Sequence, residues 1–203
     1  MDSVLAFTTK DAAVVVTDMS TNQDIFVLDH QADKIHEIFG KHMMVVTGDP
    51  GDSCSHSDFI KRNLNLMYYR DNKQQPTINA SVNWIREGMW ESIRDHPIHV
   101  KIVYAGIDED NQPSLYTIDE YGALMKPQHI AQNYAMYFLL SVFDKYWNND
   151  LDREGIIELV KKCITVLNRR MMLQQHRFMI KIATANGIER IPIDYTPEIL
   201  KAE

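Results

Sequence analysis

The chain has 203 residues, 45% of them hydrophobic, so it can bury one sizeable core and one domain is a better expectation than two. Its formal net charge of −7 argues against nucleic acid or an anionic membrane as the main partner, since both reward clustered Lys and Arg. Cys54 and Cys163 lie far apart without a CxxC pattern, which indicates reduced thiols in a cytosolic or nuclear setting. The sequence shows no secretory leader and no run of about 18 apolar residues, so we expect neither secretion nor a membrane span.

The first quarter of the sequence is expected to form strands. Short β-branched or aromatic runs are separated there by polar turns, at residues 4–7, 12–17, 24–28 and 43–47. Asp49 to Asp52 then supply capping oxygens, which predicts a helix over residues 52–70. A second helix opens at Pro76-Thr77, and its apolar residues recur at helical spacing: Ile78, Val82, Ile85, Met89 and Ile93.

Residues 100–125, VKIVYAGIDEDNQPSLYTIDEYGALM, predict an antiparallel meander. Ile102 and Tyr104 point to one face and Val103 and Ala105 to the other, and a period of two is typical of strands that pack on at least one side. Residues 108–113 contain charged and amide side chains and a proline that cannot donate to a ladder, so the chain must reverse there.

The last third of the chain predicts two helices and a hairpin. Residues 130–147 are apolar nearly all round and are expected to form a helix covered on more than one side, while residues 152–174 predict an amphipathic helix. Residues 178–183 and 187–191 predict strands that pair through an Asn186-Gly187 turn. Runs of strands and helices that are segregated in this way favour an α+β fold, a four-layer αββα sandwich of two antiparallel sheets flanked by helices.

Several motifs together resemble a known family. They are LAF at residues 5–7, Asp18 at the end of the second strand, Lys34, the turn from Gly48 to Asp52, AGxDxxxxPxLYxxD at residues 105–119 and FDKYW at residues 143–147. This pattern resembles 20S proteasome beta subunits over essentially the whole chain. The start at Met1 and the YGAL segment at residues 121–124 most resemble the non-catalytic, fourth-position beta subunits of the type-2 class. The resemblance implies an N-terminal nucleophile hydrolase fold and a single beta-type domain over residues 1–203.

The resemblance also implies which residues stand at the catalytic positions. The family uses an N-terminal Thr with a free amine, a strand-end Asp, a Lys and an oxyanion-binding glycine. Asp18, Lys34 and Gly48 match the last three, but the nucleophile position falls on Asp2. Because only Met1 precedes Asp2, we expect no propeptide whose removal would expose a new nucleophile.

Further family positions are also changed. Residues that are Ser, Asp and Ser in active subunits fall on Tyr134, Met171 and Gln174. We therefore expect no peptidase activity, no cofactor and no metal, and interpret Asp18 and Lys34 as a structural ion pair. The resemblance implies a structural role in the inner-ring wall of the proteolytic chamber, in cytoplasm and nucleus. The implied partners are third- and fifth-position beta subunits, the opposite beta ring and the alpha ring.

Three other interpretations remain open. Ser3 could serve as the nucleophile of an active hydrolase after trimming of the two preceding residues. The chain could instead be a non-catalytic beta subunit of another ring position. As a free-standing binding protein of this fold, it would be a monomer.

Other chemical motifs carry less weight. His96 and His99 form an HxxH without a nearby third ligand, so a metal site is not expected. Cys54 and His56 resemble a nucleophile beside a base, but helical residues two apart do not face each other. Residues 48–51 lack the Lys and Ser/Thr of a phosphate loop and are interpreted as a turn. Met171, Met172 and the aromatic residues of the third helix are expected to form core or subunit contacts.

Overall fold

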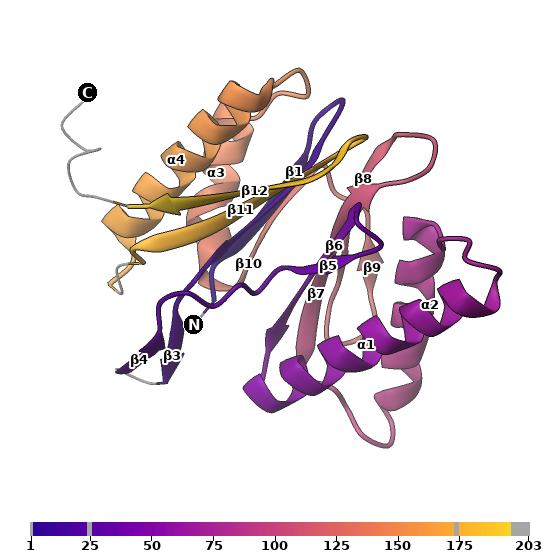
Figure 1. Ribbon diagram of the computed structural model, residues 1–203. Coiled ribbons are helices and arrows are strands. Elements are labelled where there is room, and N and C mark those ends of the chain that lie inside the picture. Colours follow the sequence, from indigo (N-terminus) through magenta and orange to yellow (C-terminus); the bar gives the residue numbers. More distant parts are fainter. Residues whose placement is uncertain (1, 24–25, 173–174, 196–203) are drawn as a thin grey trace.

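The computed structural model describes residues 2–23, 26–172 and 175–195 (Figure 1). Its helical elements are α1 Pro50–Arg70, α2 Ile78–Ser92, the short 3-10 helix η1 Asn133–Ala135, α3 Met136–Tyr146 and α4 Arg153–Arg170. Its strands are β1 Val4–Thr8, β2 Ala13–Asp18, β3 Thr21–Gln23, β4 Phe26–Asp29, β5 His36–Ile38, β6 His42–Gly48, β7 Val100–Ile107, β8 Pro113–Ile118, β9 Leu124–Met125, β10 His129–Gln132, β11 Arg177–Thr184 and β12 Gly187–Asp194.

Two antiparallel sheets form the centre of the described structure. One has the strand order β10-β1-β2-β11-β12 and the other β5-β6-β7-β8-β9, while β3 and β4 form a separate hairpin. Helices α3 and α4 cover the outer face of the first sheet, and α1 and α2 cover the outer face of the second (Figure 1). The expected α+β fold, a four-layer αββα sandwich, is therefore confirmed.

Alternating side chains divide the core into three layers. In β2, Val14 and Val16 pack under α3 and α4, whereas Val15 faces the layer between the two sheets. In β7, Ile102 packs under α1 and α2, and Val103 points into the central layer. A period of two buries both faces of each strand, as expected for sheets covered on both sides.

Polar contacts join the two sheets inside this core. Gln132 on β10 donates from Nε2 to Oγ1 of Thr117 on β8, at 3.1 Å. Its Oε1 accepts a hydrogen bond of 3.2 Å from Thr47 on β6. The three buried side chains therefore satisfy one another, which offsets the cost of removing them from water.

The third helix begins later than the sequence predicted. Residues 129–132 form strand β10, which pairs with β1, so the expected helix over 130–147 is wrong at its start. Tertiary pairing overrides the local pattern, because β1 needs a partner for its second edge. Helix α3 buries Leu139, Val142 and Phe143, but Tyr137 is 73% exposed, so within this chain the helix is covered on one side.

Other element boundaries differ in smaller ways. Helix α1 begins at Pro50 because Asp49 is the N-cap, and α4 ends at Arg170, so the segment to residue 174 is not helical where it is described. Strands β3 and β5 were not predicted, and residues 24 and 25 of the expected strand over 24–28 lie outside the described residues. Among the helices that the structure describes, none is long and apolar enough to cross a bilayer.

Candidate functional site

A cleft of about 1160 Å³ opens where both sheets meet the starts of α1 and α3. Asp2, Lys34 and Gly48 line it, so three of the four positions singled out from the sequence lie in one place. The fourth, Asp18, lies at the end of β2, where its side chain is fully buried behind Lys34. The structure therefore brings Asp2, Asp18 and Lys34 into contact, and Gly48 lines the same cleft.

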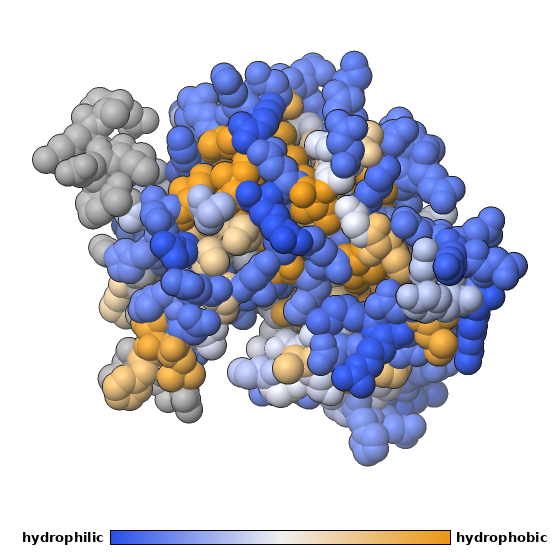
Figure 2. All heavy atoms as spheres, viewed as in Figure 1, coloured by the Kyte–Doolittle hydropathy of each residue, from blue (hydrophilic) through white to orange (hydrophobic). Residues whose placement is uncertain are grey.

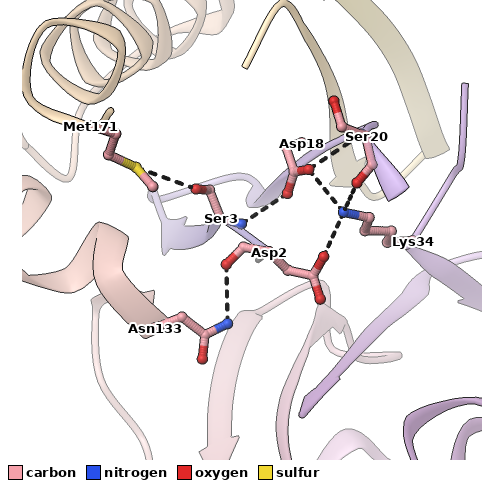
Figure 3. A network of polar contacts seen from close by, with 7 residues as sticks. All are labelled: Asp2, Ser3, Asp18, Ser20, Lys34, Asn133 and Met171. Carbon is pink, nitrogen blue, oxygen red and sulfur yellow. Dashed lines mark hydrogen bonds and ion pairs between the residues drawn. The ribbon is translucent and has the colours of Figure 1, made fainter. Parts of the chain in front are cut away.

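Lys34 is the centre of the polar network in this cleft (Figure 3). Its Nζ donates to Oδ1 of Asp2 at 2.6 Å and to Oδ2 of Asp18 at 2.8 Å. It also donates to the carbonyl oxygen of Ser20 at 2.7 Å. An ammonium group has three N–H donors, so all three have acceptors within the chain.

Asp18 is held from several directions. Its Oδ1 accepts from the backbone N–H of Ser3 at 2.8 Å, and its Oδ2 accepts from that of Ser20 at 3.2 Å. Burial raises the pKa of Asp18 above its ordinary value, and the charge and hydrogen bond of Lys34 act in the opposite direction. Because removal of Lys34 would leave a fully buried carboxylate unpaired, the pair is coupled to the stability of the strand ends.

Asp2 is fixed by its backbone as well as its carboxylate. Its carbonyl oxygen accepts from Nδ2 of Asn133, the first residue of η1, at 3.0 Å. Asn133 has a φ of +58°, a left-handed conformation that Asn adopts more readily than most residues. The carboxylate of Asp2 is thereby directed to Lys34 (Figure 3).

Ser3 points away from this cluster. Its hydroxyl lies 3.9 Å from the Met171 sulfur, on the side opposite Lys34 (Figure 3). Ser3 is only 2% exposed, and its amide nitrogen is a peptide donor to Asp18. Tyr134 lines the cleft and is 56% exposed, whereas Gln174 lies outside the described residues.

Gly48 ends β6 with a φ of +147°, in the region that favours glycine. A Cβ at this position would lie 2.1 Å from the carbonyl oxygen of His99. That close approach arises because Gly48 pairs with Val100 in the sheet. The fold itself therefore requires glycine here, independently of any oxyanion role.

The other motifs do not form chemical sites together. Cys54 lines the large cleft, while His56 lines a different groove between α1 and α2, so the two face different sides of α1. Nδ1 of His99 lies 3.8 Å from Glu120. Within the described ranges, no three or more His, Cys, Asp or Glu side chains are grouped to hold a metal ion.

A second lysine cluster was not anticipated from the sequence. Lys181 on β11 is 1% exposed, and its Nζ lies 2.7 Å from Asp33 and 2.8 Å from Glu37. It donates to the carbonyl oxygen of Ile35 at 2.7 Å as well. A lone Lys in the apolar run FMIKIAT was the available signal, because alternation directs it to the face between the sheets.

Comparison with known proteins agrees with this geometry. The proteasome subunit family matches residues 2–183, so the chain belongs to this family. A proteasome subunit beta type-2 of Oryza sativa subsp. japonica is 33% identical over 100% of this chain and 97% of its own length. A proteasome subunit beta type-2 of Dictyostelium discoideum is 32% identical over 96% of this chain and 98% of its own length. Proteasome subunit beta type-4 of Saccharomyces cerevisiae is 25% identical over 94% of this chain and 97% of its own length.

Proposed function

We propose that the chain is a non-catalytic beta subunit of the 20S proteasome core particle, a single beta-type domain over residues 1–203. In this proposal it occupies the fourth position of an inner ring and forms part of the chamber wall. Third- and fifth-position beta subunits flank it, and it contacts the alpha ring and the opposite beta ring, in cytoplasm and nucleus. Asp18, Lys34 and Gly48 are then vestigial catalytic positions, with Asp2 at the position of the nucleophile.

The main support for this proposal is that Nζ of Lys34 already donates to three acceptors within the chain. The resemblance implies that an active subunit needs this Lys to act on a threonine hydroxyl and amine at the position that Asp2 fills. Here the Asp2 carboxylate takes one N–H, and Asp18 and the carbonyl of Ser20 take the others. A carboxylate that is paired with Lys34 is a poor nucleophile toward a peptide, and it has neither the hydroxyl nor the free amine of the family's nucleophile.

The alternative nucleophile, Ser3, has no support from the geometry. Trimming to Ser3 would remove Asp2, and with it the 2.6 Å contact to Lys34. The Ser3 hydroxyl would still face the thioether of Met171, which cannot accept its proton as a general base. No observation favours this function over the non-catalytic one.

Exposed apolar surface supports the assembly part of the proposal. Phe26 and Leu28, on the projecting β3–β4 hairpin, are 66% and 63% exposed, and apolar atoms gather at the lower left of Figure 2 where this hairpin lies. The outer face of α3 adds Tyr137 and Leu140. Exposed apolar groups in two places are typical of a subunit that buries them against neighbours.

Native mass spectrometry of particles purified through a tag on this chain tests the proposal. We expect the chain in one complex with alpha-type and other beta-type subunits, and an intact mass that does not correspond to a chain starting at Ser3. A chain trimmed to Ser3 would instead support the hydrolase. Recovery of the chain only as a monomer would contradict the structural role.

A further inference from the structure

The groove between α1 and α2 forms a second site, distinct from the cleft that contains Lys34. It has a volume of about 620 Å³, within the range of ligand-binding cavities. From α1 it is lined by Asp52, Ser55, His56, Phe59 and Ile60, at spacings that place them on one helix face. Helix α2 supplies the opposite wall: Trp84, Ile85, Glu87, Gly88, Glu91 and Ser92.

His56, Phe59 and Trp84 form a stack of nearly parallel aromatic rings in this groove. His56 and Phe59 are nearly parallel, with ring centroids 6.0 Å apart and an interplanar angle of 16°. Phe59 and Trp84 are also 6.0 Å apart, at 21°. Phe59 is 53% exposed although it belongs to this stack, so part of its surface faces solvent. A planar group can extend such a stack.

The charges around the rings have one sign. Asp52, Glu87 and Glu91 line the groove, and none of the lining residues is Lys or Arg. Glu87 and Glu91 are four residues apart on α2, so their carboxylates project from the same face. Two like charges at this spacing repel each other, and a cation between them would relieve the repulsion.

Two features of the groove are not explained by contacts among the described residues. Gly88 lies inside α2, where glycine is unfavourable, yet a Cβ there would meet no heavy atom of the described residues within 4 Å. His56 is 8% exposed, and its Nε2 has no hydrogen-bond partner among the described residues. Open space above Gly88 and an unpaired buried nitrogen both fit a site whose occupant comes from another molecule.

We propose that this groove binds an arginine side chain carried by a partner protein. A guanidinium is planar and stacks on aromatic faces, so it can extend the stack of His56, Phe59 and Trp84. It also pairs with carboxylates in a bidentate way, as Glu87 and Glu91 allow, whereas an ammonium matches only the charge. The absence of a side chain at Gly88 leaves room for the aliphatic part of the arginine beside α2.

The site can be tested with a defined probe on the full chain. The peptide acetyl-Gly-Arg-Gly-amide is titrated while tryptophan emission is recorded, because Trp84 lines the groove. The matched control peptide contains citrulline, which keeps the shape of arginine without its charge. We expect saturable binding of the arginine peptide, about ten-fold tighter than that of the citrulline peptide.

Variants then locate the binding. Glu87→Gln combined with Glu91→Gln should weaken binding of the arginine peptide by about ten-fold, because both carboxylates are lost. Both residues are exposed, so their change leaves the core intact. Gly88→Phe should abolish binding by filling the groove. Glu109→Gln, on an exposed turn elsewhere, should leave binding unchanged. Equal affinity for both peptides, no saturation, or full binding by the double variant would overturn the proposal. Each result is independent of whether the chain is catalytic, which the mass of the purified subunit decides.

Discussion

Two lysines in this molecule each contact two carboxylates and one backbone carbonyl, but they lie in different places. Lys34 contacts the carboxylates of Asp2 and Asp18 and the carbonyl of Ser20. Lys181 contacts the carboxylates of Asp33 and Glu37 and the carbonyl of Ile35. The Lys181 side chain is 2% exposed, whereas that of Lys34 is 17% exposed and lines a cleft.

Under the proposed non-catalytic role, the comparison illustrates how a site keeps these residues without the family's chemistry. Lys181 holds β11 against the segment that leads into β5, so we interpret its cluster as structural. The Asp2 carboxylate gives Lys34 the same set of acceptors. A lysine whose three donors are occupied by two carboxylates and a carbonyl serves to join chain segments.

Removal of the Lys181 charge should have the largest effect. We expect Lys181→Met to lower the free energy of unfolding by about 2–4 kcal/mol, because Glu37 and Asp33 lose their buried partner but remain partly hydrated. Urea denaturation of the full chain measures this. Lys161→Met, on the exposed side of α4, is the matched control and should change little. Equal stability of the two variants would show that the cluster is not structural.

Removal of the Lys34 side chain should cost less, because burial raises the pKa of Asp18 and this carboxyl can take up a proton when its partner is lost. We expect Lys34→Ala to lower stability or assembly by about 1–3 kcal/mol, chiefly through the unpaired Asp18 carboxylate. The peptidase activities of the proposed particle should be unchanged per assembled particle. Lys34→Met combined with Asp18→Asn should recover part of the loss. If one cleavage specificity disappeared at normal particle yield, Lys34 would have a catalytic role.

The two clusters should also differ in their response to acid. The hydrogen bond from Arg190, with further help from Lys181, lowers the pKa of Glu37 from 4.5 to about 2. A folded pKa below the unfolded value gives stability that is complete above about pH 4.5 and lost as the pH falls toward 2. Burial instead raises the pKa of Asp18, so its ionisation contributes no such acid loss.

Thermal unfolding between pH 5 and about pH 2 checks this difference. Glu37→Gln should make the melting temperature depend less on pH. The acid-dependent loss in the free energy of unfolding should shrink by about 1–2 kcal/mol. Asp18→Asn, the control, should leave that acid-dependent loss in place. A flattening by Asp18→Asn and none by Glu37→Gln would reverse the assignment of the two clusters.

The sequence predicted the layers of the fold better than the contacts of the site. Alternation in residues 100–107 and the apolar stripe from Ile78 to Met89 identified the buried faces, because periodicity follows directly from which side is covered. The prediction from periodicity failed at residues 130–132, where pairing with β1 outweighs a helical pattern. The family resemblance placed Asp2, Asp18 and Lys34 together. It could not reveal the carbonyl of Ser20 or the amide of Asn133, since backbone acceptors and a left-handed residue leave no mark in spacing.

Covalent labelling by a threonine-directed electrophile in the assembled particle tests the central claim most directly. We predict no label on this chain, and none on an Asp2→Thr variant from which Met1 is removed. That variant regains a hydroxyl and an amine but keeps Met171, whose thioether faces Ser3 and supplies no strong acceptor to orient them. Label should appear only when Met171→Asp, Gln174→Ser and Tyr134→Ser are added. Label on the native chain would contradict the non-catalytic role, and label on the Asp2→Thr variant alone would show that the nucleophile was the only part missing.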